Sequence, residues 1–506
     1  MKNKSGKIFL IGAGPGDKGL ITVNALEKLK VADVVVYDRL INDELLSSCK
    51  KDCELIFVGK ESGFHPIEQE KITEILIAKS KQGNTVVRLK GGNPFIFGRG
   101  SEEAVALKKE NIDFEIIPGI TSGLAAPVYC GIPITQRGEI TQCVFITAHE
   151  CPEKPGTQVE WEKLAKLKNT SLIIYMGASR IETISKTLIK FGMDPATPAA
   201  AIENATLPIQ RTISERLDKI PELFREQNFH APVIIVISPT ISLREDICWF
   251  EKKPLFNKRI VVAGADEESE YFYNILSEYG AEVLYLPVMK TYIKNIKLNF
   301  YNHFSNNDFE WLLFSGELEV KYFFELLQRE NLDSRILGNK KIAAIGHRTA
   351  NKLKFFNLIP DYSISDFEVS SFNQEFVKKY KLKGKKILRI QNDITYDRIH
   401  QELVNSDVTI EKISIFDSGI SKPEQRIIEK LNQRTPDVLI FTQPASIDYF
   451  FNALGVKSAT EIAHNAHNVI IDPITSENIL EKNIKRYSIS TEYESKNLSE
   501  FVSKLI

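Results

Sequence analysis

Short runs of apolar residues alternate with segments of helical spacing along the first part of this chain. The apolar runs predict strands at Lys7–Ile11, Val31–Tyr37, Ile56–Val58 and Thr85–Leu89, and the spacing between them predicts helices at Leu20–Leu29 and Ile67–Lys81. Because Val31–Tyr37 is apolar at nearly every position, we expect that strand to be buried on both faces. Strands that alternate with helices indicate an α/β protein with a mainly parallel sheet, whose ligand-facing loops follow the carboxyl ends of the strands.

The same alternation continues beyond residue 118 and predicts a second α/β unit. Its strands are expected at Cys143–Thr147, Ser171–Met176, Ala199–Ile202 and Val233–Ile237. The charges of Arg244–Asn257, together with Trp249 and Pro254, indicate a linker that packs partly on a domain. We therefore expect one domain over residues 1–245, with subdomains of about 1–118 and 119–245, then a linker over 246–257 and a further domain over 258–506.

The remainder of the chain carries a weak internal repeat. Asn257–Ile260 is similar to Gly384–Ile387 at an offset of 127 (384 − 257), and Trp311–Phe314 is similar to Val438–Phe441 at the same offset. A third pair of similar segments lies at an offset of 126 (471 − 345). Three nearly equal offsets favour two copies of one α/β lobe with a ligand cleft between them, and generic similarity between strands is the alternative.

The composition of the chain excludes several classes of protein but does not indicate a function. The 506 residues are 43% hydrophobic and 26% charged, which is typical of globular proteins, and the net charge of −1 provides no field that would attract nucleic acid or a membrane. Six cysteines are scattered without metal-ligand spacing, and no apolar run reaches the roughly 18 residues of a membrane span. With no signal peptide before the strand at Lys7, we expect a cytoplasmic protein without a metal site.

The run Arg88–Gly100 is the strongest candidate for chemistry. Gly91 and Gly92 interrupt the strand at its carboxyl end, and without a Cβ they let a ligand or another backbone approach the main chain. Asp38 and Lys60 also follow predicted strands, so parallel pairing would bring them to the same edge of the sheet. The alternative interpretation of the run is a tight turn from strand to helix, with two phenylalanines in the core.

A glycine-rich loop at Gly12–Gly16 invites comparison with a dinucleotide-binding fingerprint, in which Asp38 would be the ribose contact. The fit is poor, because the sixth position is Asp17 rather than glycine. Pro15 also removes a backbone donor, and the Asp17 carboxylate would repel a pyrophosphate at a helix N-terminus. An NAD-dependent oxidoreductase is therefore the disfavoured alternative.

A series of short sequence blocks spans the first half of the chain. They are Ile11–Asp17, Tyr37–Leu40, Val58–Lys60, Arg88–Gly100, Pro118–Ser122, Gly131–Thr135, Tyr175–Gly177 and Glu203–Thr206. In content and order these blocks resemble the uroporphyrinogen-III C-methyltransferases of the tetrapyrrole methylase family. The resemblance implies two α/β subdomains with S-adenosylmethionine (SAM) between them, and methylation of uroporphyrinogen III at C2 and C7 to give precorrin-2. It also implies a homodimer formed through this half, with small-molecule tetrapyrroles as substrates.

The resemblance assigns site residues as well. For SAM it implies contacts from Pro15, Gly91, Gly92, Asn93, Ile96, Thr121, Ser122, Met176 and Ala205. Asp38 matches the family's proton acceptor and Lys60 its proton donor, although without the family a loop carboxylate and a surface amine would explain them. Candidates for binding the acidic substrate are Arg39, Arg88, Lys90 and Arg99, each of which could equally be a surface charge. The chain departs from the family at Asn93, usually Asp, and at Ala205, often Gly.

Residues from about 258 to 506 resemble uroporphyrinogen-III synthase, through the two-lobe repeat and the strand ends at Phe314–Gly316 and Phe441–Gln443. The resemblance implies two interleaved α/β lobes, with crossings near Thr291 and Asp417, that cyclise hydroxymethylbilane to uroporphyrinogen III without a cofactor. Substrate contacts are expected from Ser315, Thr349 and Thr442, although a hydroxyl at a strand end is more often a helix N-cap. Phe416 stands where the family often has a tyrosine. The alternative is therefore an active methyltransferase joined to a half that only binds substrate or has a structural role.

Overall fold

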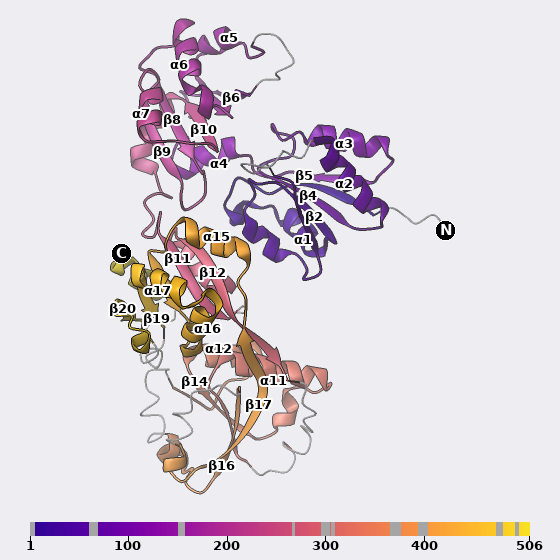
Figure 1. The fold of residues 1–506 in the computed structure, drawn as a ribbon, viewed down its shortest axis with the longest axis vertical. Helices are drawn as coiled ribbons and strands as arrows, with labels where there is room; N and C mark the ends of the chain where they lie inside the picture. Colours follow the sequence, from indigo (N-terminus) through magenta and orange to yellow (C-terminus); the bar gives the residue numbers. More distant parts are fainter. Residues whose placement is uncertain are drawn as a thin grey trace. The chain divides into compact units, whose positions relative to one another are not determined.

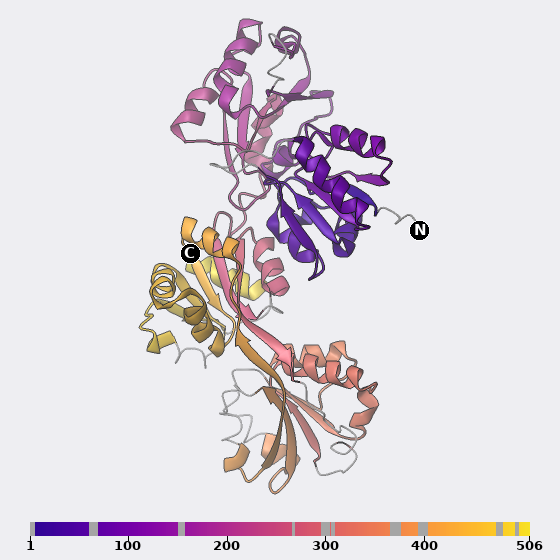
Figure 2. The ribbon, with the colours of Figure 1, turned by 45° about the vertical axis from the view of Figure 1, so that its right-hand side comes forward.

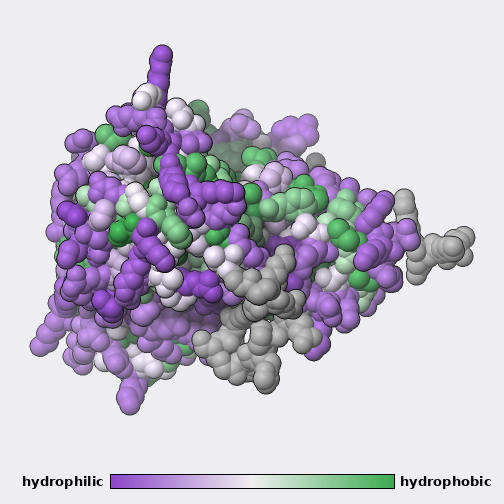
Figure 3. Space-filling view, turned by 90° about the horizontal axis from the view of Figure 1, so that it is seen from above, coloured by the Kyte–Doolittle hydropathy of each residue, from purple (hydrophilic) through white to green (hydrophobic). Residues whose placement is uncertain are grey.

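The computed structural model describes residues 6–59, 69–149, 157–265, 269–294, 304, 309–364, 376–392, 403–471, 479–490 and 495–506. The chain divides into two compact units, Met1–Asn257 and Lys258–Ile506 (Figure 1). In the described ranges no helix is long and apolar enough to cross a membrane, and no group of three or more His, Cys, Asp or Glu residues is placed to hold a metal. Polar side chains predominate on the face drawn in Figure 3, with apolar residues scattered among them, as on most globular proteins.

The first unit begins with a parallel five-stranded sheet. Its strands are β1 (Ile8–Gly12), β2 (Val34–Tyr37), β3 (Glu54–Phe57), β4 (Val86–Lys90) and β5 (Phe114–Ile117), in the order β3-β2-β4-β1-β5. The helices between them are α1 (Val23–Val31), α2 (Gln69–Lys81) and α3 (Gly100–Lys109), with 3₁₀ turns at Lys18–Leu20 and Asp43–Ser48. All the strand pairings are parallel, and apolar clusters cover both faces, so the predicted parallel sheet is confirmed. The predicted burial holds for Val34–Val36 of β2, whereas Val31, which the pattern placed in the same strand, ends α1 and is exposed. The carboxyl ends of the strands therefore meet at one edge, where Asp38 follows β2 and Gly91 follows β4.

The second sheet of this unit is mixed. It contains β6 (Gln142–Thr147), β7 (Thr170–Tyr175), β8 (Pro198–Glu203), β9 (Arg211–Arg216) and β10 (Val233–Ile237), in the order β6-β7-β10-β8-β9. Among these strands only β6 and β7 pair in parallel. The helices are α4 (Ser122–Tyr129), α5 (Trp161–Ala165), α6 (Ile181–Lys190), α7 (Ile220–Glu226) and α8 (Arg244–Ile247), with 3₁₀ turns at Ala178–Arg180 and Pro239–Leu243. The connection from β8 to β9 is short and holds no helix, which requires antiparallel pairing.

Residues 246–257 belong to the first unit by their contacts. The indole Nε1 of Trp249 donates a hydrogen bond of 3.0 Å to Val128 O, and the ring of Phe250 packs edge-on against Tyr129. Phe250 and Leu255 are buried. This segment therefore packs on the second subdomain, as its apolar residues suggested.

The second unit is built on a ten-stranded sheet. Its strands are β11 (Arg259–Ala265), β12 (Glu282–Ile293), β13 (Trp311–Phe314), β14 (Lys341–Ile345), β15 (Tyr362–Ile364), β16 (Lys386–Asn392), β17 (Thr409–Ile420), β18 (Val438–Phe441), β19 (His467–Ile470) and β20 (Tyr487–Ile489), in the order β15-β14-β13-β16-β17-β12-β11-β18-β19-β20. The helices are α9 (Ser269–Glu278), α11 (Glu317–Arg329), α12 (His347–Phe355), α15 (Gln425–Gln433), α16 (Pro444–Leu454), α17 (Val456–Asn465) and α19 (Ser495–Leu505), with a 3₁₀ turn at Ser334–Leu337. Neighbouring strands are parallel except β12 and β17, whose antiparallel pairing contains both Thr291 and Asp417.

The order of this sheet consists of two matching halves around the pair β12–β17. Strand β11 pairs with β12 from Arg259 and Glu282, and β16 pairs with β17 from Lys386 and Thr409, so both positions shift by 127 (386 − 259 and 409 − 282). The matching register confirms the internal repeat. We call strands β13–β17 the β16 lobe, and strands β11, β12 and β18–β20 the β11 lobe. Each lobe contains strands from both copies, and β12 and β17 lie side by side where the lobes join (Figure 1, Figure 2).

Candidate functional site

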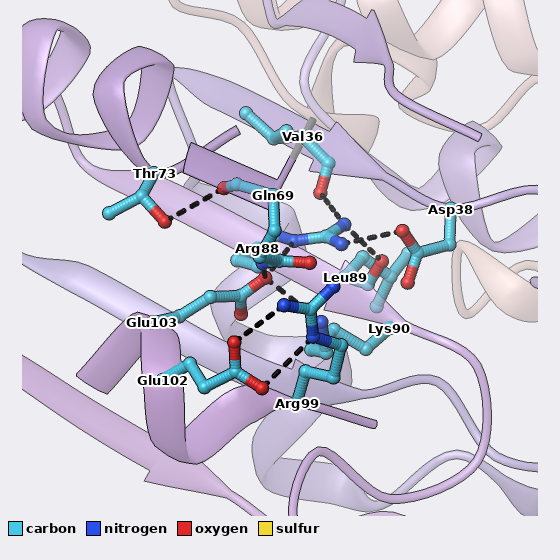
Figure 4. A network of polar contacts seen from close by, with 10 residues as sticks. All are labelled: Val36, Asp38, Gln69, Thr73, Arg88, Leu89, Lys90, Arg99, Glu102 and Glu103. Carbon is cyan, nitrogen blue, oxygen red and sulfur yellow. Dashed lines mark hydrogen bonds and ion pairs between the residues drawn. The ribbon is translucent and has the colours of Figure 1, made fainter. Parts of the chain in front are cut away.

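Charged side chains gather where β2 and β4 end. Arg88 and Lys90 are two residues apart on β4, so both side chains point to the same face of the sheet, which α3 covers. The register pairs Tyr37 with Leu89, which brings Asp38 beside them at the end of β2. As a result, Arg88 Nη2 lies 2.5 Å from Asp38 Oδ1 (Figure 4).

Glu103 of α3 is fully buried and binds both cations. Its Oε1 atom lies 3.1 Å from Arg88 Nε and 2.9 Å from Lys90 Nζ, and accepts a third hydrogen bond of 2.8 Å from Gln69 Nε2 (Figure 4). Two cations and two carboxylates thus form a network without net charge, which is the arrangement in which buried charges are tolerated. Burial and the neighbouring Arg88 lower the pKa of Lys90, whereas Glu103 and Asp38 oppose that change.

Burial contradicts the expectation that Arg88 and Lys90 bind substrate directly. Arg88 is 1% exposed and Lys90 is 4% exposed, because both side chains extend from the interior of β4 toward Glu103. The side chain of Asp38 keeps 31% of its surface exposed, so Asp38 is the member of the network that a ligand can reach. Lys60, the expected proton donor, lies outside the described residues.

Arg39 and Arg99, the other two candidates for substrate binding, are exposed. Arg39 directly follows Asp38. Arg99 Nη2 lies 2.6 Å from Glu102 Oε2, in a surface ion pair at the start of α3. Because exposed ion pairs of this kind contribute little stability, an acidic ligand can replace Glu102 at Arg99 at small cost.

Glycines bring three loops into backbone contact at this edge. Gly92 and Gly14 exchange backbone hydrogen bonds of 2.7 and 3.2 Å. A Cβ atom on Gly12 would lie 2.5 Å from Gly92 O, and one on Gly119 would lie 2.3 Å from the same atom. No larger residue fits at either position, so the glycine-rich loop after β1 has a packing role rather than that of a dinucleotide fingerprint.

Asn93 and Phe97 attach the loop after β4 to the second subdomain. Asn93 Nδ2 donates a hydrogen bond of 2.9 Å to Gly119 O, and Asn93 Oδ1 accepts one of 2.9 Å from Phe95 N. A carboxylate would lack the donor, which accounts for asparagine in this chain. The ring of Phe97 packs edge-on against Tyr175 with 5.0 Å between centroids. Phe95 and Phe97 are both exposed, which contradicts the interpretation of this loop as a turn with two core phenylalanines.

The hydroxyl of Tyr175, at the end of β7, connects that strand to α4. It lies 2.8 Å from Thr121 Oγ1 and accepts a hydrogen bond of 2.8 Å from Gly123 N. Burial raises the pKa of Tyr175, which keeps the phenol protonated. Met176 follows with a left-handed φ of 55° and a half-exposed side chain. A Cβ on Gly92 would lie 3.7 Å from Thr121 Cα, and Met176 directly follows Tyr175, whose hydroxyl lies beside Thr121. Gly92, Thr121 and Met176, three of the expected SAM contacts, therefore lie on segments that meet at one place.

Asp17 and Thr206 bring Pro15 and Ala205 together from opposite subdomains. Asp17 N donates a hydrogen bond of 3.0 Å to Thr206 Oγ1, and Asp17 Oδ2 accepts one of 2.7 Å from the Tyr129 hydroxyl. A Cβ on Gly16, the residue after Pro15, would lie 3.1 Å from Ala205 O. Thr206 has a φ of 69°, which is unfavourable for a β-branched residue and is sustained by these contacts. The Asp17 carboxylate therefore connects the two subdomains.

Three residues of this site were given no role by the sequence analysis: Glu103 and Tyr129, which belong to no sequence block, and Tyr175, which begins the block Tyr175–Gly177. Glu103 had a usable signal, because it lies next to Ala104 and four residues before Leu107, on the apolar face of α3. A charged residue on such a face is normally paired with an internal ion of opposite charge. Tyr129 shows no comparable signal. The block at Tyr175 marks that residue but does not reveal its role, because the partners of both tyrosines come from distant segments.

In the second unit, the three expected substrate contacts differ in their surroundings. Ser315 directly follows β13 and is partly exposed, with its Oγ 3.1 Å from Glu319 Oε1 and 3.3 Å from Arg389 Nη2. Thr349 and Thr442 are buried, which contradicts their direct contact with a substrate. Thr349 faces inward from α12, and Thr442 is enclosed at the end of β18.

Comparison with known proteins gives a family for each unit. Residues 7–221 match the model of the tetrapyrrole (corrin/porphyrin) methylases, and residues 258–500 match that of uroporphyrinogen-III synthase HemD. The chain is 34% identical to a porphyrin biosynthesis protein HemD of Ruminiclostridium josui over 89% of each chain. It is 38% identical to a uroporphyrinogen-III C-methyltransferase of Bacillus subtilis, over 67% of this chain and 70% of that one.

Among solved structures, a uroporphyrin III C-methyl transferase from Thermus thermophilus is 33% identical, with 47% of this chain and 99% of that chain covered and a TM-score of 0.40. The Asp38–Arg88–Glu103 network lies inside the methylase match, and the Ser315–Glu319 contact lies inside the synthase match. The chain therefore belongs to the tetrapyrrole methylases through its first unit and to the uroporphyrinogen-III synthases through its second, and it is a protein of tetrapyrrole biosynthesis.

Proposed function

We propose that the first unit is a SAM-dependent methyltransferase that methylates C2 and C7 of uroporphyrinogen III and so forms precorrin-2. The observation that carries this proposal is the partly exposed carboxylate of Asp38, fixed by buried Arg88 at the edge where the loop after β4 meets the second subdomain. The relative from Bacillus subtilis, named a uroporphyrinogen-III C-methyltransferase, supports the choice of substrate.

The residues at this edge suit SAM. A Cβ on Gly92 would be in ordinary van der Waals contact with Thr121 Cα at 3.7 Å, so the space beside this backbone holds a single methyl-sized group. Ile96 and Met176 expose apolar side chains that suit an adenine ring or a thioether. We assign the SAM contacts to Pro15, Gly91, Gly92, Asn93, Ile96, Thr121, Ser122, Met176 and Ala205. Bound SAM would supply an activated methyl group on a sulfonium centre for transfer to a pyrrole carbon.

The chain's own groups orient the substrate and move a proton. Asp38 accepts the proton that the macrocycle loses after methylation, and its exposed surface faces outward from the network. Arg88 orients Asp38, and Glu103 in turn fixes Arg88. Exposed Arg39 and Arg99 bind carboxylates of the acidic substrate, and Lys60 is the proton donor.

For the second unit, we propose cyclisation of hydroxymethylbilane to uroporphyrinogen III with loss of water. The match of residues 258–500 to uroporphyrinogen-III synthase and the two-lobed sheet support this activity. Phe416 is buried and has no hydroxyl, which favours the second candidate, a unit that binds substrate without turning it over.

One experiment tests both activities. The purified chain is incubated anaerobically with hydroxymethylbilane and SAM, and the products are analysed for mass and isomer type. Dimethylated type III product supports both proposals. Dimethylated type I product, which derives from spontaneous cyclisation, supports the methyltransferase and contradicts the cyclase. Absence of methylated product contradicts the methyltransferase.

We also propose that the chain forms a homodimer through its first unit and acts in the cytoplasm. Light scattering of the full chain, with the mass of two copies as the expected result, tests the first statement. Fractionation of the source cells tests the second.

A further inference from the structure

Polar side chains connect Glu251, near the end of the first unit, to the loop between β8 and β9. Glu251 Oε1 accepts hydrogen bonds of 2.8 Å from Gln210 Nε2 and of 2.6 Å from Thr212 Oγ1. The other oxygen of the carboxylate, Oε2, pairs with Arg244 of α8. At the opposite end of the Gln210 amide, Oε1 accepts a hydrogen bond of 2.8 Å from Thr206 N. Glu251 therefore fixes the direction in which the amide of Gln210 points, so that its oxygen faces Thr206.

The loop at the end of this connection has an unfavourable backbone conformation. Asn204 and Thr206 have left-handed φ angles of 48° and 69°, and the second is costly for a β-branched residue. Such a conformation persists only where the surrounding structure enforces it. Thr206 is buried, with its N–H bound to Gln210 and its Oγ1 accepting a hydrogen bond of 3.0 Å from Asp17 N. Without Gln210 the buried N–H of Thr206 would lose this partner, which favours a loop that moves away from Asp17.

Neighbouring residues of Glu251 reach Asp17 by a second route. The ring of Tyr129 packs against those of Trp249 and Phe250, with 5.0 and 4.8 Å between centroids. The Tyr129 hydroxyl donates a hydrogen bond of 2.7 Å to Asp17 Oδ2. Burial raises the pKa of this phenol, so it keeps its proton and remains a donor. Asp17 is thus bound at its backbone N–H by Thr206 and at its carboxylate by Tyr129.

Both routes begin in residues 249–251 and end beside the proposed SAM contacts. Pro15 lies two residues before Asp17, and Ala205 directly precedes Thr206. The methylase match ends at residue 221, so residues 249–251 lie beyond it.

We propose that residues 249–251 position the two loops that bind SAM, with Glu251 acting through Gln210 and Thr206. Glu251 and Gln210 are positioning residues in this proposal, because they act on SAM through Asp17 and the loop of Thr206. The inference rests on the proposed methyltransferase function of the first unit. It predicts that SAM affinity depends on side chains outside the segment that matches the methylase family.

The test is calorimetric titration of the full-length chain and its variants with SAM. Thr206→Val keeps the shape of threonine but removes the acceptor for Asp17 N, so we expect the Kd for SAM to rise about tenfold. Thr206→Ser keeps that acceptor, and we expect a Kd within about twofold of the wild-type value. The contrast between the two variants isolates the hydroxyl from the space that the side chain fills.

A second pair of variants tests Glu251 itself. Glu251→Ala leaves the amide of Gln210 without its acceptor, so we expect the Kd for SAM to rise several-fold. Glu251→Gln keeps an oxygen for Gln210 Nε2 and loses the charge that pairs with Arg244, so it should bind SAM nearly as the wild type does. In methylation of uroporphyrinogen III, we expect Glu251→Ala to raise the KM for SAM and to leave kcat unchanged, because the Asp38 network is intact.

Thr240→Val is the matched control. Thr240 is buried, and its hydroxyl donates a hydrogen bond of 2.6 Å to Pro133 O. It follows β10, which runs antiparallel to β7, so it lies at the edge of the sheet opposite Tyr175. We expect this variant to lower Tm as Thr206→Val does and to leave the Kd for SAM unchanged.

The outcomes separate the inference from the proposed function. Equal Kd values for Thr206→Val and Thr206→Ser, or a wild-type Kd for Glu251→Ala, overturn the inference and leave the methyltransferase proposal standing. A control that weakens SAM binding as much as Thr206→Val also overturns it, because the effect then follows from stability alone. Absence of SAM binding by the wild-type chain overturns the methyltransferase proposal and this inference with it.

Discussion

The two units each contain a buried arginine on a parallel strand that interacts with a glutamate from a helix. The two arrangements differ in how far their positive and negative charges cancel. In the first unit, Arg88 and Lys90 meet Glu103 and the partly exposed Asp38. In the second unit, Arg389 and the Ser315 hydroxyl accompany Glu319, with burial raising the pKa of that carboxyl to about 7. A neutral network of four ions can hold an exposed carboxylate in position, whereas a less compensated carboxylate can change its charge near neutral pH.

Replacing Asp38 should have the largest effect, because Asp38 is the one ion of the first network that a substrate can reach. For Asp38→Asn we expect methylation to fall about 10²- to 10⁴-fold, which is typical of losing a general base, with SAM affinity unchanged. Single-turnover assays and SAM titration measure these two quantities. Asp113→Asn, which alters an exposed pair with Lys7, is the control and should leave both unchanged. Full activity of Asp38→Asn would contradict the role of this network in catalysis.

Removing Glu103 tests the balance of charge in the first network. Glu103→Ala leaves two buried cations with one carboxylate, so we expect the free energy of unfolding to fall by about 3–5 kcal/mol. A denaturant titration in which unfolding is monitored by hydrogen exchange of peptides from β4 measures this loss in the first unit alone. The adjacent Glu102→Ala removes only an exposed pair with Arg99 and should cost less than about 1 kcal/mol. Equal effects of the two variants would show that burial does not distinguish the pairs.

Glu319→Gln tests the opposite case, a buried carboxyl that is costly to ionise. Its folded pKa of about 7 lies above the ordinary value of 4.5, so the folded state binds the proton more tightly than the unfolded state. The contribution of Glu319 to the free energy of unfolding is therefore greatest below pH 4.5. It falls as the pH rises through about 7, by up to about 3 kcal/mol. The glutamine variant lacks this loss, so its advantage over wild type should grow between about pH 5 and 8. Hydrogen exchange of peptides from β13 measures the free energy of unfolding of the variant and of the wild type. A difference between them that does not change with pH would contradict the raised pKa of Glu319.

Much of the edge that carries the first site could be predicted from the sequence. The apolar runs located β2 and β4, and parallel pairing then placed Asp38 and the Gly91–Gly92 turn at the same edge. The burial of Arg88 and Lys90 could not be read in this way, because it depends on Glu103 of α3 lying over the same face of the sheet.

The second unit shows the same limit of sequence reasoning. Its repeat offset predicted two copies of one lobe, and the register of β11 and β16 confirms them. Arg389 lies between Leu388 and Ile390 on β16, and its neighbours Ser315 and Glu319 are brought to it by tertiary pairing of β13 with β16. Sequence patterns thus locate strands and their ends, whereas the partners of buried charges follow from packing.

Asn93→Asp should have the smallest effect. It tests whether the edge of the first sheet, where β2 and β4 end, accepts another negative charge. The carboxylate can still accept from Phe95 N but cannot donate to Gly119 O, so we expect a loss of about 1 kcal/mol in stability. The added charge lies at the proposed SAM site, where it should favour the cationic groups of SAM and tighten binding several-fold. Calorimetric SAM titration of wild type, Asn93→Asp and Asn93→Ala separates these effects, because alanine loses both hydrogen bonds and adds no charge. If aspartate and alanine weaken SAM binding equally, Asn93 acts by positioning the loop after β4, and the charge at this edge is set by Asp38 and its buried partners alone.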